Sequence, residues 1–343
     1  MKKLSELIVC FTGIIVFLIY GQSILIPFIF ALLLWFTVRI FTSVSEKIPF
    51  YGNLVPNFFK KIISTIVIFF VLFVLTQIVL SSFNNIIKSH HDYDENLSHI
   101  IKKINTSFGV DIRTYIQTKS NELNIGKIAE TLFDAISNIV SSTLMILLFA
   151  IFIFLEEVHL NYKLKQIFSN SPIKFKRLND TLNKIEWSVA RYLGIKTIIS
   201  LLTGFLSYLV LISAEINFAI FWAFLIFLLN FIPTIGSLLG TIFPALFCLL
   251  QFGDFSIALT VFLIVGVIQV FIGNFLEPKW LGNSMNISPL VSILSLVFWG
   301  LIWGTTGMVI SVPITVVIII ILSQFESTKN VAILLSEKGV INK

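Results

Sequence analysis

Charged residues are scarce in this chain, and their scarcity excludes a water-soluble fold. Asp, Glu, Lys and Arg make up 12% of the 343 residues, whereas apolar residues make up 57%. A soluble globular domain carries about 25% charged residues. The apolar residues gather in runs of about 20, the length at which a helix crosses about 30 Å of hydrocarbon. The composition therefore predicts an all-α integral membrane protein.

Cysteine is also scarce, and both residues, Cys10 and Cys248, fall within apolar runs. This placement indicates neither a disulfide framework nor a thiolate metal site. The sequence lacks a GxxxxGKS/T loop for nucleotide phosphates and an HExxH motif for zinc. We therefore expect no ATP-driven transport by this chain alone, no cofactor, no metal and no enzymatic activity. The net charge of +6 is accounted for by loops expected to face the cytoplasm, so it implies no nucleic-acid partner.

The apolar runs predict about eight membrane-spanning segments, of which the sixth and the eighth are broken in the middle. They cover roughly 7–20, 22–40, 61–83, 134–155, 192–213, 218–250, 256–275 and 287–322. Only Gly21 and Gln22 separate the first two, so we expect these two to form a hairpin. The start of the chain resembles a secretory signal, but no small-residue cleavage site follows, so we expect a retained first span.

Basic residues orient the predicted segments. Lys and Arg concentrate in the loops 39–61 and 156–196 and in both tails, and such an excess marks the cytoplasmic side. Both termini are therefore expected in the cytoplasm. The chain then divides into the first three spans (1–83), an external segment (84–133), and a membrane transport core (134–343) with a cytoplasmic connector at 156–191.

The external segment and the connector both carry apolar residues at helical spacing. Leu97, Ile100 and Ile104 predict short amphipathic helices in the external segment, packed on the bundle or on a neighbouring subunit. Leu178 and Leu182 begin a stripe in the connector that basic residues flank, which predicts a helix lying on anionic headgroups. A regulatory lipid site is the alternative interpretation of the connector.

The two broken stretches carry the main functional signal. Glycine, proline and small polar residues interrupt the first at 230–237 and the second at 300–307. Backbone that leaves a helix at membrane depth must be buried in protein or line a watery cavity. Paired breaks are the best sequence pointer to the binding site of a transporter. Each stretch is long for one crossing and short for two, so two topologies stay open: kinked helices that cross once, or re-entrant hairpins.

Several motifs in the last third of the chain occur together. They are RYLGIKT from Arg191, NFIPTIGSLLGTIFPAL from Asn230, the pair Glu277-Pro278, and SPLVSILSLVFWGLIWGTTGMVISVPIT from Ser288. These motifs resemble the autoinducer-2 exporter family, also called PerM-type permeases. The resemblance is specific over roughly 190–320, and the span layout upstream is compatible with it. It implies a multi-pass protein of the bacterial inner membrane, in a family named for export of a small furanone-like signalling molecule, with some members described as sodium/proton antiporters.

Glu277 is the leading candidate for ion coupling, because an ionisable residue near the membrane is a functional candidate by default. Pro278 directly follows it and is expected to end the helix, leaving unpaired carbonyls that form a cation site with the carboxylate. Asn274 lies in the same turn. The alternatives are a helix-terminal Glu277 at the membrane interface, and hydrogen bonds between helices for Gln269 and Asn274.

Polar and small residues at the breaks are the remaining candidates. Asn230, Thr234 and Ser237 flank Pro233, whose ring removes a backbone hydrogen bond, so they can bind a polar solute or satisfy the freed carbonyls. We favour the second use. The transport-site candidates are Glu277, Asn274, Asn230, Thr234 and Ser237, and the helix-break residues are Pro233, Gly236, Pro278, Gly300, Gly304 and Gly307.

The sequence thus favours a secondary transporter that exports a small polar solute, such as a signalling molecule, or exchanges ions across the membrane. Its expected partners are the lipid bilayer, the solute or an ion such as a proton or sodium, and further copies of the chain. The alternative is a non-transporting membrane scaffold or envelope-assembly subunit. In that case the small residues of the breaks serve close helix packing.

Overall fold

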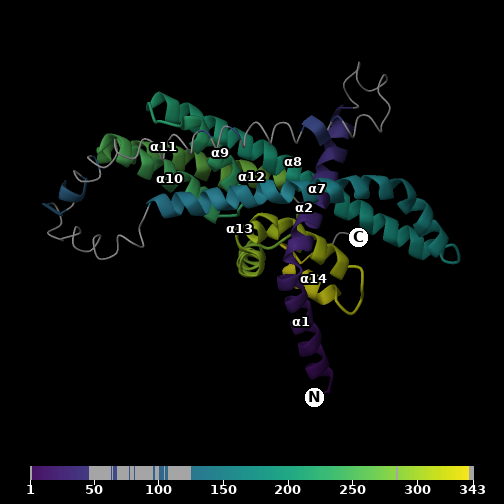
Figure 1. The fold of residues 1–343 in the computed structure, drawn as a ribbon. Coiled ribbons are helices and arrows are strands. Elements are labelled where there is room, and N and C mark those ends of the chain that lie inside the picture. Colours follow the sequence, from purple (N-terminus) through teal and green to yellow (C-terminus); the bar gives the residue numbers. More distant parts are fainter. Residues whose placement is uncertain are drawn as a thin grey trace. The chain divides into compact units, whose positions relative to one another are not determined.

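The computed structural model describes residues 2–45, 125–282 and 285–339, together with scattered positions between 63 and 106 (Figure 1). All regular elements in this part of the chain are helices. The chain forms two compact units, which we describe separately. Unit 1 comprises Met1–Thr65, Ser142–Lys196 and Trp280–Lys343, and unit 2 comprises Ile66–Ser141 and Thr197–Lys279.

Five helices among the described residues are long and apolar enough to cross a membrane, which agrees with a multi-pass membrane protein. The apolar helices at 8–20 and 219–229 are shorter. The predicted third span, 61–83, lies almost wholly outside the described residues, and the count of eight spans therefore stays a prediction. The five membrane-length segments are Gln22–Arg39, Pro172–Ser213, Ile235–Phe252, Phe255–Leu281 and Pro289–Leu322.

Helices α1 (Lys2–Tyr20) and α2 (Gln22–Ser45) of unit 1 follow one another along one line (Figure 1). The predicted hairpin is wrong, because helical hydrogen bonding continues through the junction. The amide of Gly21 donates to the Phe17 carbonyl at 2.8 Å, and the amide of Leu25 donates to the Gly21 carbonyl at 2.9 Å. At about 1.5 Å per residue the two helices together extend about 65 Å. Because the chain does not reverse between these two helices, only the basic residues of the N-terminal tail itself indicate on which side of the membrane the N-terminus lies.

Helices α7 (Ile125–Ile167) and α8 (Pro172–Ser213) contain 43 and 42 residues and are joined by the short turn 168–171. Each is about 63 Å long, twice the hydrocarbon thickness. Residues 172–191 of the predicted connector therefore continue into the fifth span as one helix, α8, whereas residues 156–167 belong to α7. The placement of the connector on anionic headgroups stays a prediction.

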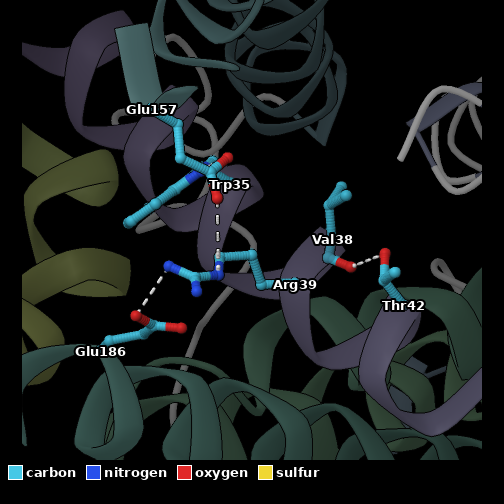
Figure 2. A network of polar contacts seen from close by, with 6 residues as sticks. All are labelled: Trp35, Val38, Arg39, Thr42, Glu157 and Glu186. Carbon is cyan, nitrogen blue, oxygen red and sulfur yellow. Dashed lines mark hydrogen bonds and ion pairs between the residues drawn. The ribbon is translucent and has the colours of Figure 1, made fainter. Parts of the chain in front are cut away.

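One arginine of α2 links α7 and α8 within unit 1 (Figure 2). The guanidinium of Arg39 lies 2.8 Å from a carboxylate oxygen of Glu186 and 3.8 Å from one of Glu157. The indole N–H of Trp35 donates to Glu157 at 2.9 Å, and Arg39 lies 5.1 Å from the centre of the Trp35 ring. Arg39 is one of the basic residues that indicate the orientation of the chain, and it also lies at the centre of this polar network.

Besides parts of α7 and α8, the described residues of unit 2 form two antiparallel helices and a long third one, whose last two residues belong to unit 1. They are α9 (Ala219–Leu229), α10 (Ile235–Phe252), and α11 (Phe255–Phe271), which continues as the π-helix η1 (Ile272–Leu276) and as α12 (Glu277–Leu281). Their common core includes Leu211 of α8, Ile226, Phe247 and Val265. Asp254 caps α11, because its carboxylate accepts a hydrogen bond from the Ser256 amide at 2.7 Å.

The described part of the external segment packs on the end of α10. The side-chain amide of Asn96 donates to the carbonyls of Leu250 at 3.1 Å and Gln251 at 2.7 Å, which otherwise lack helical partners. Ile100 is buried, whereas Leu97 and Ile104 of the predicted stripe lie outside the described residues. This contact holds the segment to the same end of unit 2 as the loop that follows α8.

Candidate functional site at the helix breaks

The first broken stretch folds back on itself, and we call α9, the turn 230–234 and α10 the first hairpin. The rings of Trp222 and Phe247 lie 5.0 Å apart, and a Cβ on Gly240 would lie 3.7 Å from the Cα of Ile226. At its base, the side chain of Gln251 donates to the Glu215 carbonyl and accepts from the Asn217 amide, both at 2.8 Å. The stretch therefore begins and ends at the same place, as a hairpin does and a kinked helix does not.

The tip of the first hairpin is strained and tightly packed. Thr234 has φ 63° and ψ −55°, and the Ile235 amide donates to the Pro233 carbonyl at 2.6 Å. These values describe a γ-turn of the rare, strained type. A Cβ on Gly236 would lie 1.7 Å from the Leu229 carbonyl oxygen, so only glycine fits. Backbone strain of this kind is retained where the surrounding structure enforces it, often at binding sites.

The three polar candidates of the first hairpin have different partners. Asn230 is 7% exposed, and its side-chain amide donates to the Ser200 hydroxyl of α8 at 3.0 Å. The Ser237 hydroxyl donates to the Thr234 carbonyl at 2.9 Å. Ser237 thus satisfies backbone freed at the break, as the favoured interpretation has it, whereas Asn230 joins two helices. The side chain of Thr234 is exposed at the tip.

Pro278 does not end its helix, contrary to the prediction. The amide of Glu277 donates to the carbonyl of Ile272, five residues back, and the wider π-turn allows the chain to remain helical through Pro278 as far as Leu281. In a regular α-helix the proline ring would clash with the carbonyl four residues earlier. The helix end that was expected to leave several unpaired carbonyls beside Glu277 is therefore absent, and only the one hydrogen bond that the Pro278 ring removes is lost. The signal that remains is the π-helix itself, a form frequently found at functional sites, with Asn274 exposed and Glu277 half-buried.

The second broken stretch is also a hairpin, formed by the two halves of α13 (Pro289–Leu322) in unit 1. The helix is interrupted at Trp303 (φ −126°, ψ 16°) and Gly304 (φ 61°, ψ −145°). The indole N–H of Trp299 then donates to the Thr315 hydroxyl at 3.3 Å. These residues are 16 apart in sequence, and in a straight helix they would be about 24 Å apart. We call residues 289–322 the second hairpin.

The glycines of the second hairpin serve two different purposes. A Cβ on Gly307 would lie 2.0 Å from the Trp299 carbonyl oxygen, and one on Gly300 would lie 3.0 Å from Met308 Cε, so both permit close approach of the two halves. Gly304 has no atom within 4 Å of that position. Its φ and ψ are values that side-chain-bearing residues strongly disfavour, and the turn requires glycine for that reason.

The structure groups the candidates by unit. Asn230, Thr234 and Ser237 meet at the first hairpin of unit 2, and Asn274 and Glu277 lie further along the same unit. The glycines Gly300, Gly304 and Gly307 belong to unit 1. Sequence reasoning missed the buried hydroxyls of α8, whose spacing of three and four residues gives the signal of one polar helix face. These residues are Ser200, Thr203 and Ser207, each fully buried.

Comparison with known proteins agrees with the motifs. The sequence model of AI-2E family transporters matches residues 6–327. The chain belongs to the AI-2E transporter family. This membership confirms the resemblance to autoinducer-2 exporters and, with the membrane-length helices, makes the protein a multi-pass membrane protein of the permease type.

Similar proteins come from several bacteria. A Haemophilus influenzae protein, whose name proposes transport and gives no substrate, is 30% identical over 290 residues, covering 82% of this chain and 83% of that protein. A similarly named protein of Borreliella burgdorferi is 34% identical over 255 residues, covering 73% and 68%. The AI-2 transport protein TqsA of Escherichia coli is 36% identical over 206 residues, covering 60% and 58%. The names indicate transport rather than catalysis.

Proposed function

We propose that this AI-2E family protein is a secondary transporter that exports a small polar solute, or exchanges ions, through a site in unit 2, which contains the first hairpin and Glu277. The observation that supports this most is the pair of helical hairpins, each with a turn that only glycine permits. Ordinary helix packing needs neither a strained γ-turn at Thr234 nor the unusual backbone of Gly304. Interrupted helices of this kind present backbone groups to a solute at membrane depth.

We propose that both hairpins are re-entrant. Helix α9 has 11 residues and is about 16 Å long, half the hydrocarbon thickness. The other arm, α10, has 18 residues and is about 27 Å long, so with its base at the membrane surface the tip at Thr234 would lie within a hydrocarbon layer of about 30 Å. The start of the second hairpin contacts the helix that follows the hairpin, because the Ser288 amide donates to the Leu335 carbonyl of α14 (Lys329–Leu335) at 3.1 Å. In the membrane, the helix of residues 255–281, which follows the first hairpin in the sequence, would then cross once.

Glu277 is the residue we propose for ion coupling. It is half-buried at the end of the π-helix, and its carboxylate is the ionisable group nearest in sequence to the exposed amide of Asn274. A carboxylate in this position can release a proton or attract a sodium ion as the site changes its access. We further propose that the protein acts as a homo-oligomer, which native mass spectrometry from membranes would show as a multiple of the 38.8 kDa chain.

The test is flux in reconstituted vesicles, measured with a panel of small solutes and with or without a proton or sodium gradient. Glu277→Gln should abolish gradient-driven flux, because an amide cannot release a proton or supply a full negative charge. Glu215→Gln, in an exposed turn, is the matched control and should retain flux. Unchanged flux and pH dependence in Glu277→Gln would remove Glu277 from the mechanism. Absence of any flux in the wild-type protein would favour the scaffold alternative.

A further inference from the structure

Three buried hydrogen-bond donors in unit 2 have no partner among the described residues. They are the hydroxyl of Ser207 on α8, the indole N–H of Trp222 on α9 and the side-chain nitrogen of Gln269 on α11. An indole N–H and an amide nitrogen donate hydrogen bonds but do not accept them. Because buried polar groups in native proteins are almost always paired, the missing partner is one that presents acceptor atoms.

Gln269 occupies a notch that Gly240 leaves open. The residue is 5% exposed, and its side-chain nitrogen lies 2.9 Å from the point where a Cβ on Gly240 would be. The Cα of Ile226 lies 3.7 Å from the same point. The amide is therefore aimed between the two helices of the first hairpin, one turn of α9 before the break that starts at Asn230.

The other two donors lie beside the same hairpin. Trp222 is one turn before Ile226 on α9, so it is close to the level of Gln269. Helices α8 and α9 run antiparallel. Ser200 is hydrogen-bonded to Asn230, and further along α8 a Cβ on Gly204 would lie 3.0 Å from the carbonyl oxygen of Ala223, which is earlier on α9. The next turn of α8 brings Ser207 to the level of Trp222.

The donor set is uncharged. None of Ser200, Thr203, Ser207, Trp222, Asn230 and Gln269 is ionisable, and all are described residues of unit 2. Lys196, one turn before Ser200, is buried and already engaged in an interaction of its own. A charged solute would need a countercharge in such a site. The chemistry therefore suits a neutral solute.

We propose that the donors centred on Gln269, in the notch at Gly240, bind a small neutral solute through its oxygen atoms. The inference rests on the transport function proposed above and specifies the chemical class of the solute. It also gives the Gln269 amide nitrogen a role other than hydrogen bonding between helices, because that nitrogen has no acceptor among the described residues.

The first experiment measures thermal unfolding of the purified protein with and without glycerol or erythritol as neutral, oxygen-rich probes. Without a polyol, Gln269→Leu should unfold at or above the wild-type temperature, since the variant removes an unpaired donor. Gln251→Leu, which loses the two hydrogen bonds from the end of α10 to Glu215 and Asn217, should unfold at a lower temperature. The polyol should raise the unfolding temperature of the wild type more than that of Gln269→Leu, because the variant shows only the general osmolyte effect.

The second experiment compares two glycine substitutions in vesicles loaded for erythritol flux. In Gly240→Ala the new Cβ would meet the Gln269 amide, whereas in Gly266→Ala it would lie 3.6 Å from a Thr241 methyl group, an ordinary contact. Gly240→Ala should reduce flux by at least about tenfold, since tenfold corresponds to the loss of one good hydrogen bond to the solute. Gly266→Ala should stay within about twofold of the wild type.

Each outcome has a definite meaning. A lower unfolding temperature for Gln269→Leu without polyol makes the amide structural and overturns the site, as does a polyol effect equal in both proteins. Equal flux in Gly240→Ala and Gly266→Ala also overturns it. Wild-type flux that survives in Gln269→Leu refutes the site while leaving transport intact. A polyol effect that requires Gln269 without any flux supports the site and refutes the transport function.

Discussion

Substitutions of Gly236 and Gly304 should harm the protein for different physical reasons. At Gly236 the obstacle is steric, since the new Cβ would meet the Leu229 carbonyl oxygen at 1.7 Å. Overpacking costs about 1–3 kcal/mol, and backbone carbonyls yield little, so the upper part of that range applies. Alanine in place of a helical glycine gains about 0.5–1 kcal/mol. Gly236→Ala should therefore lower stability by about 2 kcal/mol. Gly236→Leu should lower it further, because the larger side chain brings more atoms into the same space.

At Gly304 the obstacle is the backbone conformation alone. The space around it is open, so side-chain size matters little, and the cost is about 1–3 kcal/mol for any residue with a Cβ. Gly304→Ala and Gly304→Leu should therefore lose similar stability. Ile264→Leu, at a position 44% exposed on α11, is the control and should stay within about 0.5 kcal/mol of the wild type.

The assay is thermal unfolding of the detergent-solubilised variants, followed by flux in vesicles. The expected order is wild type and Ile264→Leu highest, then Gly236→Ala and the two Gly304 variants, and Gly236→Leu lowest. Wild-type stability and flux in Gly236→Leu would refute the close packing of the first hairpin. A much larger loss in Gly304→Leu than in Gly304→Ala would refute the conformational argument for the second hairpin.

The polar network and the orientation give two further predictions. Arg39→Met should lower stability by about 1 kcal/mol, because Glu157 and Glu186 lose their partner in a half-exposed setting. The double variant Arg39→Met with Glu186→Gln should recover part of this loss. The control, Arg177→Met on the exposed face of α8, should not change stability. For orientation, in a Cys10→Ser background an impermeant thiol reagent should label Lys102→Cys from outside but not Ser169→Cys; labelling of Ser169→Cys from outside would reverse the topology. Asn96 is unsuitable for the probe, since its side chain holds the end of α10.

The sequence by itself determined the class of protein and the breaks within 230–237 and 300–307. Long apolar runs with few charges have only one stable solution in a bilayer, the helix with all backbone groups paired. Pro233 and Gly304 interrupt those runs for local reasons, a missing amide and a required backbone angle, and local reasons can be read from local sequence. The motifs around them likewise sufficed to indicate the family.

Only the tertiary structure decided how the interrupted helices continue. Gly21 is compatible with a turn and with a helix, and the structure adopts the helix. Pro278 is accommodated because five residues before it form a π-turn, a choice that propensity does not reveal. Gln269 is a polar residue in an apolar run, and whether its amide is paired depends on which helices surround it. Burial and pairing are properties of neighbours distant in sequence, so they appear only when the chain has folded.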